Sequence, residues 1–326
     1  MQQLSTVSID VHLHPGDLQR LLRDEVAHGL ALSPKELSPK WLYDDAGCAL
    51  FDEITRLPEY YPTRREREIL ERRAGEIAEV TRADTLVELG SGSGEKTLVL
   101  LDGLARAGTL ARYAPFDVAE LVVRDLAERT AERYPGLEVH GVVGDFTSQL
   151  DLVPTGGRRL IAFLGGTIGN LFPVERRAFL TTLAAGLAPG DAILVGTDLV
   201  KDVSRLEAAY DDAAGVTARF NLNLLAMLNR ELDADFDLDG FEHVARFDQD
   251  EEWIEMRLRS RADQVVRVRA LGLTAVFAAG EELRTEISAK FRREGVEAEL
   301  AAAGLELDRW WTDAQGDFAL WLATRA

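Results

Sequence analysis

The sequence predicts an α/β protein built on a mostly parallel, doubly wound sheet and carrying a second, inserted α+β domain. Residues 85–196 alternate short apolar strands with helices, the pattern of parallel strand pairing. Residues 241–277 instead alternate apolar and charged side chains, which is typical of antiparallel strands with one wet face. The chain has 326 residues, more than the roughly 200 that one such sheet needs, so a second domain is expected.

Two helices are predicted before the alternating region. Apolar residues at helical spacing between positions 18 and 26 predict the first, and Gly29 is placed to end it. The second covers the charged residues 63–80. The aromatic-rich residues 40–62 lie between them.

The alternating region then supplies five strands and three helices. The predicted strands are residues 85–89, 112–117, 137–143, 159–164 and 192–196, and the predicted helices are residues 96–104, 118–133 and 176–187.

A different pattern follows this region. One long helix is predicted over residues 206–233, then the antiparallel strands, then a helix over 295–304 and two strands over 305–311 and 318–324. This order resembles the Rossmann-like, seven-stranded sheet of class I methyltransferases, whose last strand runs antiparallel. We expect residues 63–198 and 291–326 to form the cofactor-binding methyltransferase domain, and residues 1–62 and 199–290 to form a substrate-recognition domain.

Composition excludes several classes of function. The net charge is 37 − 56 = −19, and no basic track is present, so a nucleic-acid partner is not expected. No apolar run approaches the roughly 20 residues of a membrane span, and the polar N-terminus does not look like a secretory signal. The single cysteine rules out a disulfide framework, and we expect a cytoplasmic protein without a membrane partner.

A glycine loop follows the first predicted strand. It has the pattern Gly90-x-Gly92-x-Gly94 and is preceded by the acid Glu88. Glu95 stands where the dinucleotide pattern G-x-G-x-x-G requires glycine, which argues against a nicotinamide cofactor. The loop favours S-adenosylmethionine (SAM), with its backbone approaching the ligand at a helix N-terminus.

Polar residues at further strand ends suit the rest of that cofactor. Asp117 can accept both ribose hydroxyls, and Asp145 can accept from the adenine amine with Phe146 packing nearby. Lys96 can pair with the carboxylate of the cofactor. Each also has a plain interpretation, as a helix cap, a loop acid or a surface lysine, but together they favour the cofactor site.

Several longer segments resemble one family, the histidine Nα-methyltransferases of ergothioneine biosynthesis. They are residues 57–63, 87–96, 163–170, 196–202 and 285–288. The resemblance implies that the α-amino group of free L-histidine is methylated three times to hercynine. It also implies that SAM becomes S-adenosylhomocysteine, that no metal takes part, and that the enzyme is a monomer.

The resemblance also assigns residues to roles. It implies that Glu286 and Ser288 bind the imidazole, that Tyr43 lies near the amine, and that Met256 lines the side-chain pocket. We expect Tyr43 and Asn170 to take part in catalysis, Tyr43 through an associated water that removes protons. The residues implied for the amino-acid head group are Tyr60, Asn170 and Tyr210, and those for the cofactor are Gly90, Ser91, Lys96, Asp117, Asp145 and Phe146.

Two positions depart from the family pattern, and three competing functions stay open. Gly166 stands where serine is expected and Ala289 where cysteine is expected, but neither removes an expected ligand. A methyltransferase for another amino acid, such as tryptophan or tyrosine, would be expected to differ at Glu286 and Met256. A nicotinamide oxidoreductase and a SAM sensor that does not catalyse are the second and third competing functions.

Overall fold

The computed structural model describes residues 6–92 and 94–326, which divide into two compact units. Of the described residues, unit 1 contains 6–14, 64–92, 94–199 and 291–326, and unit 2 contains Pro15–Thr63 and Val200–Lys290. Residues 6–14 thus lie in unit 1, although the sequence pattern suggested that all of 1–62 belongs to the substrate domain. Residues 1–5 of that expected domain, and Ser93 of the glycine loop, lie outside the described residues.

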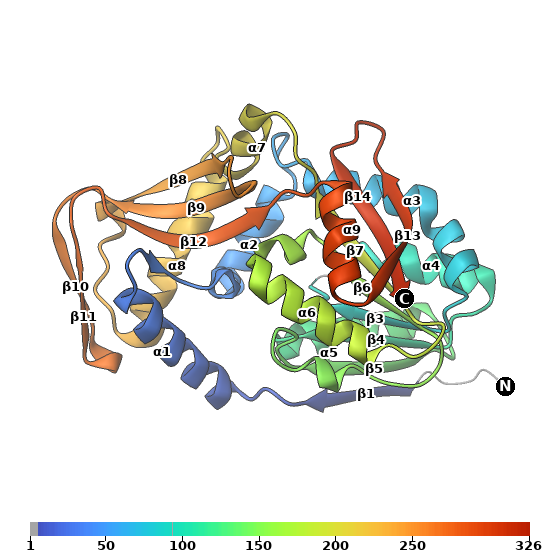
Figure 1. Cartoon of the computed structure of the whole chain (residues 1–326). Helices are drawn as coiled ribbons and strands as arrows, with labels where there is room; N and C mark the ends of the chain where they lie inside the picture. The colour runs from blue at the N-terminus through green and yellow to red at the C-terminus, as the bar shows by residue number, and fades with distance from the viewer. Residues whose placement is uncertain (1–5, 93) are drawn as a thin grey trace. The chain divides into compact units, whose positions relative to one another are not determined.

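Unit 1 is built on one sheet with the strand order β1-β5-β4-β3-β6-β7-β14-β13, visible in Figure 1. Neighbouring strands from β1 to β7 pair in parallel, and β14 is antiparallel to both of its neighbours. The predicted α/β class and the antiparallel last strand are therefore confirmed. The strands are Thr6–Val11 (β1), Thr85–Leu89 (β3), Arg112–Asp117 (β4), Glu138–Val143 (β5), Arg159–Phe163 (β6), Ala192–Asp198 (β7), Leu305–Thr312 (β13) and Phe318–Arg325 (β14).

The expected number of seven strands was wrong, because β1 adds an eighth beside β5. Its burial pattern shows why the sequence conceals it. Val7 is exposed and Ile9 only half-buried, so this edge strand lacks the continuous burial of inner strands. β3, by contrast, is buried at all five positions.

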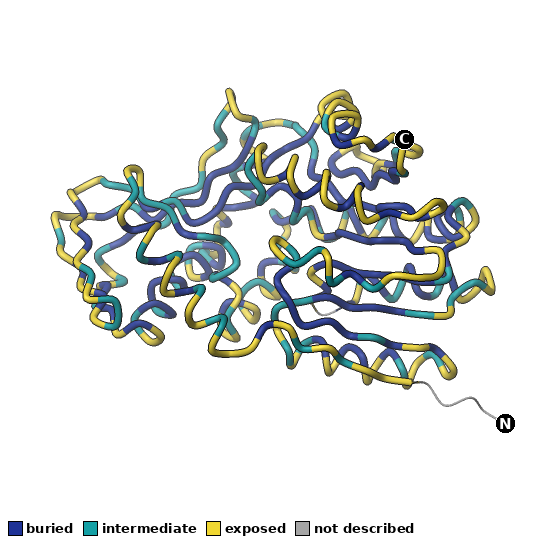
Figure 2. Tube along the Cα trace, turned by 60° about the horizontal axis from the view of Figure 1, so that its bottom comes forward, coloured by how far each residue is buried: buried dark blue, intermediate teal, exposed yellow. Residues whose placement is uncertain are grey.

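Helices cover both faces of the sheet in unit 1 (Figure 1). α3 and α4 pack closely, since a Cβ on Gly103 of α4 would lie 2.9 Å from the Ala74 carbonyl oxygen of α3. Figure 2 shows the resulting pattern, with buried strands inside and exposed outer faces on the helices. The helices are Pro62–Thr81 (α3), Thr97–Ala107 (α4), Glu120–Arg133 (α5), Pro173–Gly186 (α6) and Arg293–Ala302 (α9).

Unit 2 packs helices against a four-stranded sheet of order β2-β12-β9-β8, with a separate two-stranded ribbon of β10 and β11. Its helices are Pro15–Ala31 (α1), Asp45–Ile54 (α2), Val203–Tyr210 (α7) and Val216–Leu232 (α8). Its strands are Lys35–Glu36 (β2), Phe241–Asp248 (β8), Trp253–Ser260 (β9), Gln264–Val268 (β10), Leu273–Phe277 (β11) and Glu282–Ala289 (β12).

Two helix boundaries in unit 2 differ from the prediction. Gly29 does not end the first helix but lies inside α1, where a Cβ would come 2.0 Å from the Glu36 carbonyl oxygen. The single helix expected over residues 206–233 is two helices. The Asp212 carboxylate accepts from the backbone N–H groups of Val216 and Thr217 at 3.0 and 2.7 Å, and so caps a new helix.

The predicted wet face of β9 is also largely covered. Glu255 and Arg257 are buried at 3% and 8% exposure, because they pair with each other and with charged neighbours on β8 and β12. The alternation itself is correct, since Ile254, Met256 and Leu258 face the core of unit 2.

Candidate functional site

The glycine loop joins β3 to α4 in unit 1 and has a backbone that favours glycine. Gly90, Gly92 and Gly94 have φ values of 68°, 46° and 70°, in the left-handed region. A Cβ on Gly94 would also lie 2.4 Å from the Leu126 side chain of α5. The sequence pattern of this loop therefore has a local physical cause.

Asp117, at the end of β4, contacts the loop directly. One carboxylate oxygen accepts from the Gly92 N–H at 3.0 Å, and the other accepts from the Ala119 N–H at 3.1 Å. Burial raises the pKa of Asp117, and these backbone bonds oppose that shift. Each oxygen has a second lone pair with which to accept from a ligand hydroxyl.

Asp145 and Phe146 follow the end of β5. Asp145 is buried, and its carboxylate accepts from the Thr147 backbone N–H at 2.9 Å. Phe146 lies beside the loop, since a Cβ on Gly90 would be 3.4 Å from its ring. The structure thus brings the residues predicted from three strand ends together.

Lys96 pairs with Glu66 of α3, a residue that the sequence pattern did not single out. Glu66 is fully buried and also accepts from the Gly165 N–H, at 2.9 and 3.0 Å to its two oxygens. A carboxylate in this position joins α4 to the loop after β6. The sequence signal for Glu66 is its helical spacing, which puts it on one helix face with the buried Leu70 and Ile77.

Glu88, the acid before the loop, lies inside unit 1. It accepts hydrogen bonds from Thr97 Oγ1 and, at 2.7 Å, from Tyr113 Oη. Burial raises its pKa to about 7, with the two hydrogen bonds opposing the shift. Glu88 therefore links the end of β3 to the start of α4 and to β4.

One atom in the loop lacks a partner of its own. Ser91 Oγ is buried without a hydrogen-bond partner among the residues that the structure describes. An orphaned hydroxyl beside left-handed glycines and a carboxylate at the end of the next strand suits a polar ligand such as SAM. The donors and acceptors present in unit 1 thus fit the expected cofactor.

The residues expected to bind substrate lie in unit 2, apart from Asn170. That residue ends the short helix Thr167–Asn170 after β6, in unit 1. Glu286 and Ser288 lie on β12, opposite Met256 and Ile254 of β9, so all four share one sheet face.

A β-bulge determines which face Glu286 occupies. Pairing shifts by one residue between Arg284 and Glu286, and the Thr285 hydroxyl donates to the Met256 carbonyl oxygen at 3.0 Å. Arg284 therefore faces the charged side of the sheet, whereas Glu286 faces the apolar side. Glu286, with 7% exposure, is thus a buried carboxylate on a mostly apolar face.

Tyr210 of α7 joins Ser288 in a hydrogen-bonded group. The two hydroxyl oxygens are 2.7 Å apart, and Lys290 Nζ donates to Tyr210 Oη at 3.0 Å and to Ser288 Oγ at 2.9 Å. Lys290 is 3% exposed and was not among the residues predicted from the sequence. The sequence signal for Lys290 is the two-residue period of a strand, which puts residues 286, 288 and 290 on one face of the chain.

Tyr43 and Tyr60 belong to the same cluster in unit 2. The Tyr60 and Tyr210 rings contact each other edge to face, with centroids 6.2 Å apart. The pKa of Tyr43 is raised, first by burial and then by the charge of Glu286, although part of its surface is exposed. A raised pKa keeps this phenol protonated at neutral pH.

His243 of β8 contacts this cluster through Tyr210. Its Nε2 donates to the Tyr210 carbonyl oxygen at 2.8 Å, and its Nδ1 accepts from Asn221 Nδ2 at 2.9 Å. Burial lowers the pKa of His243, which keeps the ring neutral. The expectation that the scattered histidines are structural fits this one.

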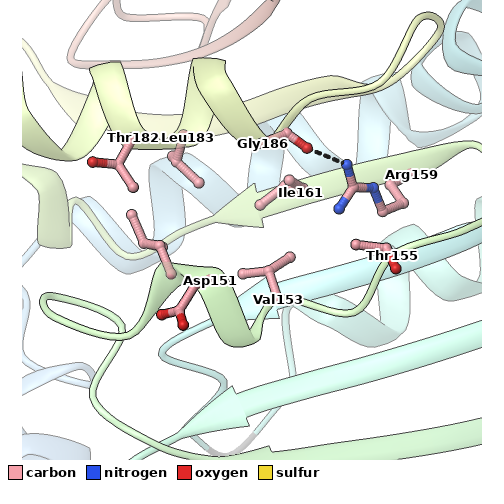
Figure 3. Close-up of a pocket in the computed structure, with 9 residues that line it drawn as sticks. Asp151, Val153, Thr155, Arg159, Ile161, Thr182, Leu183 and Gly186 are labelled. Atoms are coloured by element: carbon pink, nitrogen blue, oxygen red, sulfur yellow. Dashed lines mark hydrogen bonds between the residues drawn. The ribbon is translucent and has the colours of Figure 1, made fainter.

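The pocket drawn in Figure 3 is separate from these residues. Arg159 lies at the amino end of β6, whereas the cofactor candidates follow the carboxyl ends of the strands. Arg159 is also occupied, since it pairs with Asp191 and donates to the Gly186 carbonyl oxygen at 2.6 Å. We therefore assign this pocket no part in the chemistry.

Metal ligands and membrane spans are both absent from the part of the chain that the structure describes. Residues 6–92 and 94–326 contain no group of three or more His, Cys, Asp or Glu side chains arranged to hold a metal ion. No helix within those ranges has the length and apolar character needed to cross a membrane.

Comparison with known proteins adds a family match. The family described as "Histidine-specific methyltransferase, SAM-dependent" matches residues 22–325. The chain is 57% identical to a histidine N-alpha-methyltransferase of Mycolicibacterium smegmatis, over 98% of this chain and 100% of that protein. A protein of the same name from Mycobacterium tuberculosis is also 57% identical, over 98% of this chain and 99% of that protein.

A fungal protein matches at lower identity. Ergothioneine biosynthesis protein 1 of Neurospora crassa is 30% identical, over 86% of this chain but only 32% of its own length. The similarity therefore covers one part of that longer protein.

Proposed function

Because the chain belongs to the histidine-specific, SAM-dependent methyltransferase family, we propose that it transfers three methyl groups to the α-amino nitrogen of L-histidine. The product is hercynine, and the reaction is the first step of ergothioneine biosynthesis, in keeping with the name of the fungal relative. The observation that carries the choice of substrate is the position of Glu286 and Ser288. They put one carboxylate and one hydroxyl on the apolar face of β12.

Unit 1 binds the cofactor in this proposal. The backbone of Gly90 and Ser91 approaches it, Asp117 accepts from the ribose hydroxyls, and Asp145 accepts from the adenine amine beside Phe146. Lys96 supplies a cation for the carboxylate while Glu66 fixes its position. When bound, SAM supplies a methyl group carried on a sulfonium sulfur. A neutral amine can attack that methyl carbon in line with the leaving sulfur.

Unit 2 recognises the amino acid. Glu286 accepts from one ring nitrogen of imidazole, and Ser288 bonds the other. Tyr60 and Tyr210 bind the head group, and Met256 lines the side-chain pocket. A polar pair of this kind rejects apolar side chains, because phenylalanine or leucine would leave both groups unpaired.

Proton removal is assigned to a water held by Tyr43. The ammonium of free histidine must lose a proton before each transfer, and the nitrogen stops reacting when three methyl groups and no lone pair remain. Since the pKa of Tyr43 is raised, the phenol does not act as a phenolate base. It orients the water that takes the proton, and Tyr43→Phe should slow all three transfers; unchanged rates would exclude this role.

The enzyme is further proposed to work as a cytoplasmic monomer on free histidine, without a nucleic-acid or membrane partner. The net charge of −19 supports the absence of a nucleic-acid partner. Sedimentation at micromolar concentration tests the monomer.

Mass spectrometry tests the main proposal. Incubation with histidine and SAM should add three methyl groups to histidine and none to tryptophan or tyrosine. If no methylated histidine forms, and calorimetry detects no histidine binding, the proposal fails. A methylated tryptophan or tyrosine would support the second candidate, a methyltransferase for another amino acid.

A further inference from the structure

His243 lies on β8, on the apolar face of the unit 2 sheet. It pairs with Leu258 of β9, which faces the core of unit 2, so the imidazole ring points to that side as well. α7 and α8 both pack against β8 (Figure 1). The two ring nitrogens bond one residue of each helix, Tyr210 of α7 and Asn221 of α8.

The bond to α7 is made at the end of that helix. Tyr210 is its last residue, and His243 Nε2 donates to the Tyr210 carbonyl oxygen at 2.8 Å. The last four carbonyl groups of a helix have no partner within the helix, so their direction depends on donors from elsewhere. Because α7 has only eight residues, a donor at its final carbonyl helps to fix where Tyr210 lies.

The bond to α8 fixes the ring itself. Asn221 is fully buried, and its Nδ2 donates to His243 Nδ1 at 2.9 Å and to the Arg257 carbonyl oxygen at 3.1 Å. The amide cannot turn over, because its oxygen would then face the Arg257 carbonyl oxygen. With a donor held against Nδ1, the proton of the neutral ring is on Nε2, the atom that faces Tyr210. Burial lowers the pKa of His243, which favours this neutral form.

We propose that His243 is a positioning residue for histidine binding, which holds Tyr210 at the end of α7 where its hydroxyl binds the head group of the amino acid. The inference rests on the proposed function, because it takes Tyr210 as a ligand of that head group. His243 does not contact the substrate in this proposal and acts through the backbone of Tyr210. The Tyr210 hydroxyl oxygen is also 2.7 Å from Ser288 Oγ, so a shift of Tyr210 would disturb a second residue of the proposed site.

Two amide side chains distinguish this role from simple filling of the core. In His243→Gln the amide nitrogen can reach the place of Nε2 and donate to Tyr210, whereas in His243→Asn the shorter side chain reaches only the place of Nδ1. Calorimetry of histidine binding in saturating S-adenosylhomocysteine, which prevents turnover, compares the two. His243→Gln should bind histidine within about threefold of the wild type, and His243→Asn about tenfold more weakly, the effect of one lost hydrogen bond.

A double-mutant cycle tests whether the effect passes through Tyr210. Tyr210→Phe removes the hydroxyl that binds the head group and leaves the backbone carbonyl in place. In that background, the difference in histidine affinity between His243→Gln and His243→Asn should shrink to less than about twofold, because the position of the ring no longer decides a hydrogen bond to the substrate. A difference of about tenfold that persists in the Tyr210→Phe background would overturn the inference.

Controls separate the outcomes. His140→Asn changes a histidine that pairs with Asp10 in unit 1, and should leave histidine affinity unchanged. Affinity for S-adenosylhomocysteine alone should be the same in all these variants. Equal histidine affinities of His243→Gln and His243→Asn would overturn the inference, and so would a loss of about tenfold in His243→Gln. If the wild type binds no histidine, the proposed function itself fails, and the inference fails with it.

Discussion

Glu286 is the residue whose position says most about specificity. It is a buried carboxylate on the apolar face of β12. The bulge at Thr285 turns it to that face, whereas Arg284 lies on the charged face. Placing an ionised group there costs folding free energy unless a partner satisfies it. In the proposed function, an imidazole N–H of the substrate donates to this carboxylate.

We expect Glu286→Gln to weaken histidine binding by about 10- to 100-fold, the usual effect of losing a charge-assisted hydrogen bond. Binding of SAM should not change, and calorimetry with each ligand measures both. Glu282→Gln is the matched control, because Glu282 lies on the opposite face of the same strand and pairs with Arg259. Equal losses for both ligands would point to misfolding and contradict the assignment.

Glu88 makes a prediction about stability. Its pKa is about 7 in the fold and near 4.5 when unfolded, so the native state binds the extra proton between these values. The free energy of unfolding should therefore fall as pH rises from about 4.5 to 7, by an amount on the order of 3 kcal/mol from this group.

Glu88→Gln removes this proton and should abolish that component. Urea unfolding of the wild type and the variant at pH 5, 6, 7 and 8 gives the difference. Glu79→Gln, an exposed acid on α3, should show no such trend. A wild-type minus Glu88→Gln difference that is constant with pH would show that Glu88 does not titrate in this range.

At the scale of elements, Glu66 joins α3, α4 and the loop after β6, and β7 leaves space for it. A Cβ on Gly196 of β7 would lie 2.0 Å from Glu66 Oε1. Gly196→Ala should therefore displace Glu66, cost about 1–3 kcal/mol, and weaken SAM binding through Lys96.

Gly75→Ala provides the same substitution in open space, because nothing lies within 4 Å of its Cβ position on α3. It should stabilise the protein by about 0.5–1 kcal/mol, since alanine is the better helix former. Thermal unfolding and SAM titration of both variants test the pair. Normal SAM affinity in Gly196→Ala would separate Glu66 from the cofactor site.

Elements with a strong periodic pattern could be predicted from the sequence, and elements defined by one residue could not. β3 and β7 are buried throughout and mostly apolar, and they were predicted within two residues of their observed ends. The edge strand β1 and the break between α7 and α8 were missed. One is half exposed, and the other depends on the Asp212 cap.

The site shows the same division. Residues at strand ends, such as Asp117 and Asp145, follow from topology, because parallel strands bring their carboxyl ends together. Spacing places Glu66 and Lys290 on interior faces, but their roles could not be identified, since these depend on contacts with Gly165 and Tyr210 that lie 99 and 80 residues away in sequence.

At the scale of the whole molecule, charge is the dominant property. With a net charge of −19, the folded chain repels itself, while its exposed ion pairs contribute little. Raising NaCl from 20 to 200 mM, chosen to shorten the Debye length to under about 10 Å, should raise the melting temperature. Sucrose at equal osmolality controls for effects other than screening, and a falling melting temperature would mean that the screened ion pairs matter more.

The position of β14 has a consequence for the order in which the protein is made. β14 lies between β7 and β13, so the last strand of this sheet to be synthesised is an interior strand. All the residues of unit 2 precede position 291, and its folding can begin while the edge of β7 is still unpaired. During synthesis, that open edge is liable to wrong pairing until residues 318–325 close it.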